Sequence, residues 1–152
     1  MLIAANWGSS AIVKVLIDAR ADIKARDSEG KTALILAASN EEPQLAKLLI
    51  DAGADVDAKD EDGNTALMNA AGDDRVQIVK ALIDAGAKIN AKDNDGRTAL
   101  MRANELETAL LLLNAGADLT IRDKQGQTAL SLAIENEQEE IVKLLKLRGA
   151  RE

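Results

Sequence analysis

The chain has 152 residues, of which 47% are hydrophobic, 1% aromatic and 30% charged, and its formal net charge is −7. It contains no cysteine and no histidine, which excludes disulfides, zinc fingers and catalytic systems built on either residue. The acidic balance argues against a protein that binds the nucleic-acid backbone, and no apolar run approaches the roughly 20 residues that span a bilayer.

The apolar residues are mainly alanine, leucine, isoleucine and valine, which suits closely packed helices better than a β-sandwich. The start, MLIAANWGSS, lacks the basic stretch of a secretory signal. We therefore expect an all-α, cytoplasmic protein without membrane insertion.

The first segment of the chain is the least complete of five related segments. When Ala4-Ala5 is aligned with Ala37-Ala38, the chain begins inside the first helix of its segment. The second helix ends at Arg20, where the other segments have glycine. This indicates either a fragment of a longer array, which we favour, or a frayed first unit that serves as a cap.

The second segment is the most regular one. Residues 27–31 (DSEGK) are expected to form a turn, and Thr32 should cap the helix that follows it. Pro43 is suited to the first position of a second helix, because its missing N–H costs nothing there. Gly53 should end that helix in the left-handed conformation.

The same phrase then recurs, as DEDGNTALMNAA at residue 60, DNDGRTALMRAN at 93 and DKQGQTALSLAI at 123. The starts are 33, 33 and 30 residues apart when residue 27 is included. Such recurrence indicates stacked copies of one small unit, which share the same geometric demands. We expect helices to begin at Thr32, Thr65, Thr98 and Thr128.

The fourth segment is three residues short. Its turn and Gly116 both survive, so the deletion lies around residues 104–108, where it should shorten the loop between the two helices. Leu110 occupies a position that is lysine in the other segments, so either the helix is rotated or Leu110 is exposed. Exposure at that position would suggest an apolar contact site; otherwise the change is drift.

The last segment carries Lys146 where the others have isoleucine or leucine. A polar residue is expected on the final unit of a stack, because no neighbour covers it. We therefore expect residues 123–152 to form a C-terminal cap.

Four copies of G-x-T-A-L, with a trailing G-A-D at Gly53 and Gly116, make the chain resemble the ankyrin repeat family along essentially its whole length. The resemblance implies a single solenoid domain, 1–152, of helix-turn-helix units joined by β-turn or hairpin loops. The expected units are 1–26, 27–59, 60–92, 93–122 and 123–152.

The chain departs from the family motif at two positions. The motif proline is alanine in all four copies, and the motif histidine is replaced by Ile35, Met68, Met101 and Ser131. In the family, that histidine is thought to join adjacent loops by hydrogen bonds. Without it, the loops are expected to depend more on threonine caps and apolar packing.

The resemblance implies a non-catalytic module that binds another protein through its turn tips and the ends of its first helices. No cofactor is implied, and a monomer is expected. Carried onto this chain, the expected contact residues are Asn6, Trp7, Ser28, Glu29, Lys31, Ser39, Asn40, Glu61, Asp62, Asn64, Gly72, Asp73, Asn94, Asp95, Arg97, Lys124, Gln125, Gln127, Glu135 and Asn136.

The charge pattern suggests what the partner carries. The five units have net charges of +2, −4, −2, −2 and −1 in chain order. We expect a partner with basic residues opposite the second and third units, and an association that slows as salt rises.

Trp7 falls in a slot where other units have asparagine or aspartate, which favours a role in binding, since tryptophan is enriched among interface hot spots. It is equally compatible with covering the edge of the incomplete first unit, or with contacting a unit that precedes it.

No catalytic or metal-binding pattern was found. The turns at 60 and 93 resemble calcium loops, but Ala58 and Ala91 occupy the first ligand places, so turn-capping carboxylates are expected instead. The cluster of Glu137, Glu139 and Glu140 is explained by the helix N-terminus that it precedes.

A second class of function stays open. The chain could be a structural or regulatory segment of a larger modular protein, such as a channel, kinase or secreted effector, whose activity lies outside it.

Overall fold

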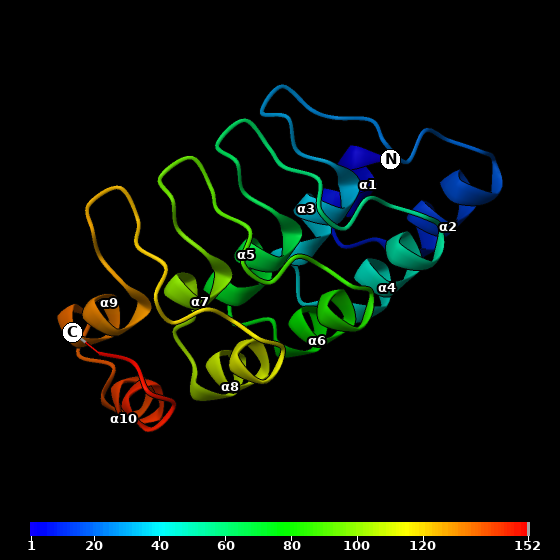
Figure 1. Ribbon diagram of the computed structural model, residues 1–152. Helices are drawn as coiled ribbons and strands as arrows, with labels where there is room; N and C mark the ends of the chain where they lie inside the picture. Colours follow the sequence, from blue (N-terminus) through cyan, green and yellow to red (C-terminus); the bar gives the residue numbers. More distant parts are fainter. Residues whose placement is uncertain (152) are drawn as a thin grey trace.

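The computed structural model of the protein describes residues 1–151. This part of the chain forms ten short helices, each of four to nine residues (Figure 1). They are α1 (Leu2–Asn6), α2 (Ser10–Asp18), α3 (Ala33–Ala38), α4 (Pro43–Asp51), α5 (Ala66–Gly72), α6 (Val76–Asp84), α7 (Ala99–Arg102), α8 (Leu106–Asn114), α9 (Ala129–Glu135) and α10 (Glu139–Leu147).

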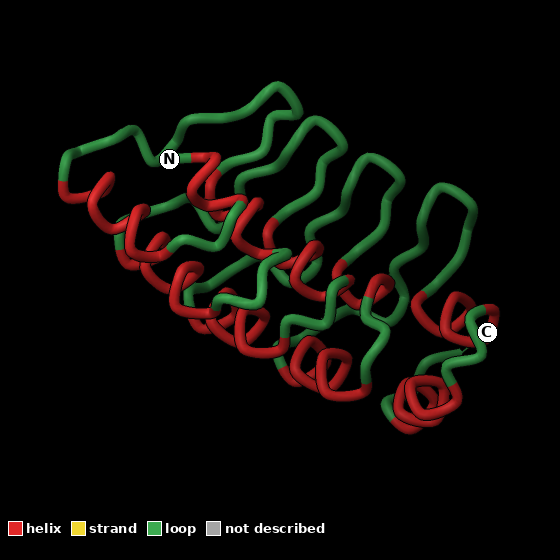
Figure 2. The backbone as a smooth tube through the Cα atoms, turned by 180° about the vertical axis from the view of Figure 1, so that it is seen from behind, coloured by secondary structure: helices red, strands yellow, loops and turns green. Residues whose placement is uncertain are grey.

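The helices form two parallel layers. The odd-numbered helices lie side by side in one layer and the even-numbered helices in the other, with the two termini at opposite ends (Figures 1 and 2). Each helix packs against its own partner and against the next helix of its layer. The long loops that precede α3, α5, α7 and α9 project from the same side. This arrangement confirms the predicted all-α solenoid.

The four predicted threonines each precede the helix that was expected to begin there. The hydroxyls of Thr32, Thr65 and Thr128 accept a hydrogen bond from the third N–H of their helices, at 3.3, 3.3 and 3.2 Å. Thr98 differs, because its side chain makes no cap bond. Its helix is one tight turn, in which the Met101 N–H donates to the Thr98 backbone carbonyl at 3.2 Å.

The predicted left-handed end of α4 is present at Gly53, which has φ 86°. The Gly53 N–H donates to Ile50 O and the Ala54 N–H to Leu49 O, which together close the helix. Arg20 makes the equivalent bonds after α2, with φ 58°. A residue with a side chain is strained there by about 1 kcal/mol.

The core runs the length of the stack between the two layers. It is made of small alanines, which let helices approach closely, and of leucine, isoleucine and methionine side chains that point between the layers. Leu34, Leu45 and Leu67 are typical, with at most 1% of their surface exposed. Within residues 1–151, no helix is both long enough and apolar enough to cross a membrane.

The shortened fourth segment corrects one prediction. The loop between α7 and α8 spans residues 103–105, the same length as loops 73–75 and 136–138. The missing residues have instead been removed from the helix, since α7 has 4 residues where α5 and α9 have 7. The loop that places α8 in its layer therefore keeps its length, and α7 is shorter by about one turn.

The two unusual residues of α8 have different environments. Leu110 is half-exposed and lies outside the core. Thr108 is completely buried at the position of Leu45, Ile78 and Ile141 in α4, α6 and α10, and its hydroxyl has no hydrogen-bond partner among the described residues. A buried hydroxyl without a partner is destabilising.

The first helix pair leaves apolar side chains uncovered. Ile12 is 54% exposed, whereas Leu45, its counterpart in α4, is fully buried by the preceding pair. Ile3 and Val15 are also exposed. At the other end Lys146 and Leu147 are exposed, so the last pair is only partly polar.

The long loops are joined to one another by backbone hydrogen bonds. The N–H groups of Glu61, Asn94 and Lys124 donate to Glu29 O, Asp62 O and Asp95 O at 3.0, 2.9 and 2.8 Å. The expectation that these loops would depend on threonine caps and apolar packing was therefore incomplete. Peptide groups, which need no histidine, join the loops here.

Alanine substitution at two matched glycines would measure this loop-to-loop contact. Gly63 and Gly126 both have positive φ, 80° and 78°. A Cβ on Gly63 would lie 2.8 Å from the Asn94 backbone nitrogen, whereas a Cβ on Gly126 meets nothing within 4 Å. We expect Gly63→Ala to lower the free energy of unfolding by about 1–3 kcal/mol more than Gly126→Ala, measured by urea denaturation. Equal losses would mean that the close approach of the loops does not matter.

Replacing the buried hydroxyl should stabilise the protein. Thr108→Val keeps the shape of the side chain and removes the unpartnered oxygen, so we expect the free energy of unfolding to rise by about 1 kcal/mol. The urea midpoint should increase with an unchanged slope. The control is Thr120→Val, because the exposed Thr120 hydroxyl donates to Asp118 at 2.7 Å and its loss should bring no gain.

Candidate functional site

The candidate site is the edge formed by the four long loops. Each loop has a tight turn at residues 27–31, 60–64, 93–97 and 123–127, and we call these the turns. In each one the N–H of the first residue, an aspartate, donates to the carbonyl of the fifth at 2.9–3.1 Å. The turns are therefore fixed internally as well as joined to one another.

The leading aspartate of each turn serves the backbone. In Asp60, for example, one carboxylate oxygen accepts from the N–H groups of Asp62 and Asn64, at 3.1 and 2.7 Å. The same pair of bonds occurs at Asp27, Asp93 and Asp123. This confirms the predicted turn-capping carboxylates.

The side chains at the turn tips are exposed. Among the expected contact residues, this holds for Ser28, Glu29, Glu61, Asp62, Asn94, Asp95, Lys124 and Gln125. In the part of the chain that the structure describes, the carboxylates of Glu61, Asp62 and Asp95 form no ion pair. These groups are available to a ligand.

The expected contact residues at the fifth turn position are half-buried and engaged inside the protein. Lys31 pairs with Glu29, and Arg97 lies 3.4 Å from the buried Asp123 carboxylate. Asn64 accepts a hydrogen bond from Arg102, and Gln127 donates to Glu135. These side chains hold the turns in place, and a ligand would have to displace their partners.

The ends of the odd-numbered helices are more varied. Asn6, Trp7, Ser39, Asp73, Glu135 and Asn136 are exposed, while Gly72 is half-buried. Asn40 is also half-buried, and its amide donates to Ala5 O at 2.8 Å and to Leu36 O at 3.2 Å. Asn40 therefore joins α1 to α3.

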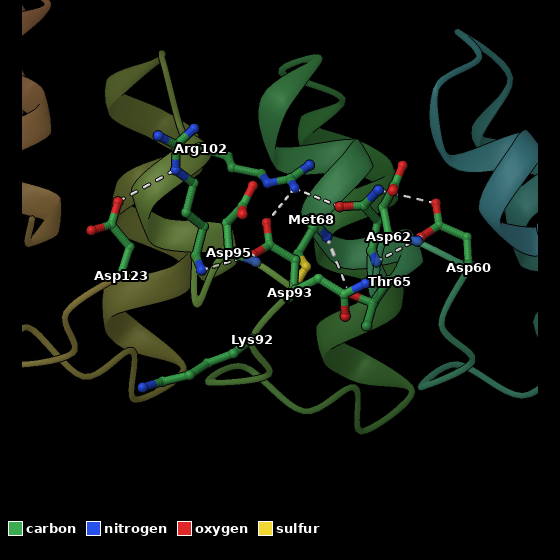
Figure 3. Close-up of polar contacts among 12 residues, drawn as sticks. Asp60, Asp62, Thr65, Met68, Lys92, Asp93, Asp95, Arg102 and Asp123 are labelled. Carbon is green, nitrogen blue, oxygen red and sulfur yellow. Dashed lines mark hydrogen bonds and ion pairs between the residues drawn. The ribbon is translucent and has the colours of Figure 1, made fainter. Parts of the chain in front are cut away.

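Arg102 is a residue of this edge that sequence reasoning missed. Its guanidinium donates to the carboxylate of Asp93 and to the side-chain oxygen of Asn64, so it connects two neighbouring turns (Figure 3). The signal in the sequence was an arginine at a helix position that is Ile3, Leu36, Asn69 or Leu132 in the other units.

Two groups at the turns have shifted pKa values. Burial would raise the pKa of Asp93, but the hydrogen bond from Arg102 and those from the Arg97 and Asp95 backbone outweigh it and lower the pKa. The hydrogen bond to Glu29 raises the pKa of Lys31, against a smaller effect of burial. Both groups are thus charged near neutral pH.

One hollow in the surface is lined by several of the expected contact residues. It has a volume of about 340 Å³ and lies between α1, the first turn and α3. Its lining consists of Leu2, Ile3, Asn6, Trp7, Asp27, Glu29, Lys31 and Leu36. Leu2, Ile3, Asp27 and Leu36 were not expected there. We call this site the Trp7 hollow.

The family model described as ankyrin repeats (3 copies) matches residues 1–93, 43–123 and 92–151. Because these matches together cover almost the whole chain, the protein belongs to the ankyrin repeat family. Ankyrin repeats are generally protein–protein interaction modules and are typically non-catalytic. No curated protein is similar enough to the chain to count as a relative.

The bond between Arg102 and Asp93 should make stability depend on pH. The lowered pKa of Asp93 means that its contribution is present above the ordinary aspartate pKa, about 3.9, and is lost as the pH falls through the lower folded value. We expect Arg102→Met to lower the free energy of unfolding by about 1–2 kcal/mol near neutral pH, and by less in acid. Urea denaturation across that pH range measures both values.

Arg122→Met is the matched control, because the exposed Arg122 donates to a backbone carbonyl, Gly126 O, rather than to a carboxylate. Its effect should not change with pH. An Arg102→Met effect that is the same in acid and at neutral pH would show that Asp93 is not the partner that matters.

Proposed function

We propose that the protein binds another protein through the exposed tips of its turns and the adjoining ends of its odd-numbered helices. The observation that carries the proposal is the row of turns joined by backbone hydrogen bonds while the tip side chains face outward. Because the backbone of the turns is already fixed, binding costs less conformational entropy than it would in a flexible loop. We further propose the repeat boundaries 1–26, 27–59, 60–92, 93–122 and 123–152 for the units of this surface.

We propose a partner segment with basic residues, facing the turns at 60–64 and 93–97. The unpaired carboxylates of Glu61, Asp62 and Asp95 support this. Basic side chains precede the turns, but those of Arg26 and Lys59 are directed to backbone carbonyl groups, Lys59 O and Lys92 O. In the described chain, none of the basic residues that precede the turns forms an ion pair with these three carboxylates.

The second candidate is a structural or regulatory segment of a larger modular protein, such as a channel, kinase or secreted effector. The uncovered apolar side chains of Ile3, Ile12 and Val15 on the first helix pair favour it. The length of the native reading frame distinguishes the two candidates.

Charge reversal at one turn tests the proposed surface. The double variant Glu61→Lys with Asp62→Lys changes two exposed side chains. The fold should be unaffected, because the backbone groups of these residues, and not their side chains, join the turns. We expect partners captured by the native protein to be lost, and a purified partner to associate roughly tenfold more slowly. Association of the native protein should also slow as salt rises.

The control carries the same charge change on the even-numbered helices, as Asp51→Lys with Asp84→Lys, both exposed. This variant should keep the partners. If it loses them equally, or if capture is unaffected by Glu61→Lys with Asp62→Lys, the proposed surface is wrong.

A further inference from the structure

The Trp7 hollow combines three kinds of surface. The indole of Trp7, 80% exposed, supplies an aromatic face. Ile3 and Leu36 supply apolar surface from two neighbouring helices. Asp27 and Glu29 supply carboxylates from the first turn.

The backbone beneath Trp7 is held firmly. The Trp7 N–H donates to Ile3 O at 3.1 Å, and the N–H groups of Gly8 and Ser9 donate to Ala5 O and Ala4 O at 3.1 and 3.0 Å. Asn40 adds its bond to Ala5 O from the next helix pair. The indole is therefore displayed on a fixed backbone, and at 80% exposure it covers little of the first pair.

The carboxylates are only partly used by the protein. One oxygen of Asp27 accepts from the Glu29 and Lys31 N–H groups, both at 2.9 Å, and the other oxygen accepts no hydrogen bond within the described chain. Glu29 pairs with Lys31, which is the single positive charge in the lining. The lining therefore has a net charge of −1 and would attract a cation.

A guanidinium group fits this combination of surfaces better than other common anchors. It stacks on aromatic faces, it is weakly hydrated, and its donors match carboxylates, while its three-carbon stem can lie on apolar side chains. An ammonium group is a strongly hydrated point charge that gains less from stacking. An anionic anchor would be repelled by the two carboxylates.

We propose that the Trp7 hollow takes an arginine side chain from a basic segment of the partner protein. The stem lies on Ile3 and Leu36, and the guanidinium stacks on Trp7 and pairs with the carboxylates of Asp27 and Glu29. Lys31 competes with the incoming cation for Glu29. This assignment rests on the proposed function and specifies the chemistry of one anchor within it.

The fluorescence of Trp7 offers a direct measurement, because the chain contains no other aromatic residue. The probe is a short glycine peptide that contains two arginines, titrated into the full chain, with the same peptide containing citrulline as its uncharged counterpart. We expect a saturable change in emission with the arginine peptide, and a dissociation constant at least about fivefold weaker for the citrulline peptide.

Two substitutions should act in opposite directions. Glu29→Gln removes a carboxylate and should weaken binding of the arginine peptide by about threefold to fivefold. Lys31→Gln removes the competing cation and should tighten it by a similar factor. Glu41→Gln is the matched control, since Glu41 is an exposed glutamate that pairs with Arg75, outside the hollow, and it should leave affinity unchanged.

Trp7→Leu, followed by calorimetry, should abolish measurable binding while circular dichroism and the urea midpoint stay unchanged. Equal affinity for the arginine and citrulline peptides, a missing emission change, or the same direction of effect for Glu29→Gln and Lys31→Gln would each overturn the assignment. The charge reversal at Glu61 and Asp62 tests the surface separately, so the proposed function can survive the loss of this anchor.

Discussion

Burial against neighbours is the constraint on which the structure depends. Helices of four to nine residues are too short to be stable alone in water, and each pair has too little apolar surface to form its own core. Alanine-rich faces let the next pair approach closely, and the turns then come within hydrogen-bonding distance. The bond from Glu61 N–H to Glu29 O, at 3.0 Å, is therefore a consequence of helix packing, and it in turn fixes the edge formed by the turns.

In the turns, the atoms that stabilise the fold differ from those proposed to bind a partner. Backbone groups and the leading aspartates form the hydrogen bonds within and between turns, and the residues at the fifth position pair with neighbours. Among the tip side chains, Asn94 donates to Glu61 O and Glu29 pairs with Lys31, whereas the carboxylates of Glu61 and Asp62 take no part in these bonds within the described chain. Substitutions at Glu61 and Asp62 are therefore expected to leave the fold intact.

Local features were predictable from sequence, and contacts between neighbouring pairs were not. Thr32, Pro43 and Gly53 act on backbone atoms within a few residues, so their roles follow from residue type and spacing. Arg102 reaches Asn64, which is 38 residues away, and no pattern in either segment reveals that pair. The deletion was misplaced for a similar reason: the sequence shows that residues are missing, but the packing of α8 decides that α7 loses them. The repeat pattern predicts which residues lie at the exposed tips. It does not predict the Trp7 hollow, because that depends on the distance between α1 and the first turn.

The proposed anchor in the Trp7 hollow would also link binding to the stability of the first helix pair. That pair is covered on one side only, and its apolar residues Ile12 and Val15 remain exposed. Its stability therefore depends on a single neighbouring pair, α3 and α4, whereas an inner pair is supported by two. The lining of the hollow comes from α1 on one side and from the first turn and α3 on the other. A ligand that occupies it bridges the two pairs, and by mass action it stabilises the conformation in which they are docked. An anchor at this position would therefore add a contact between the first two pairs, so that partner binding and the docking of the first pair reinforce each other.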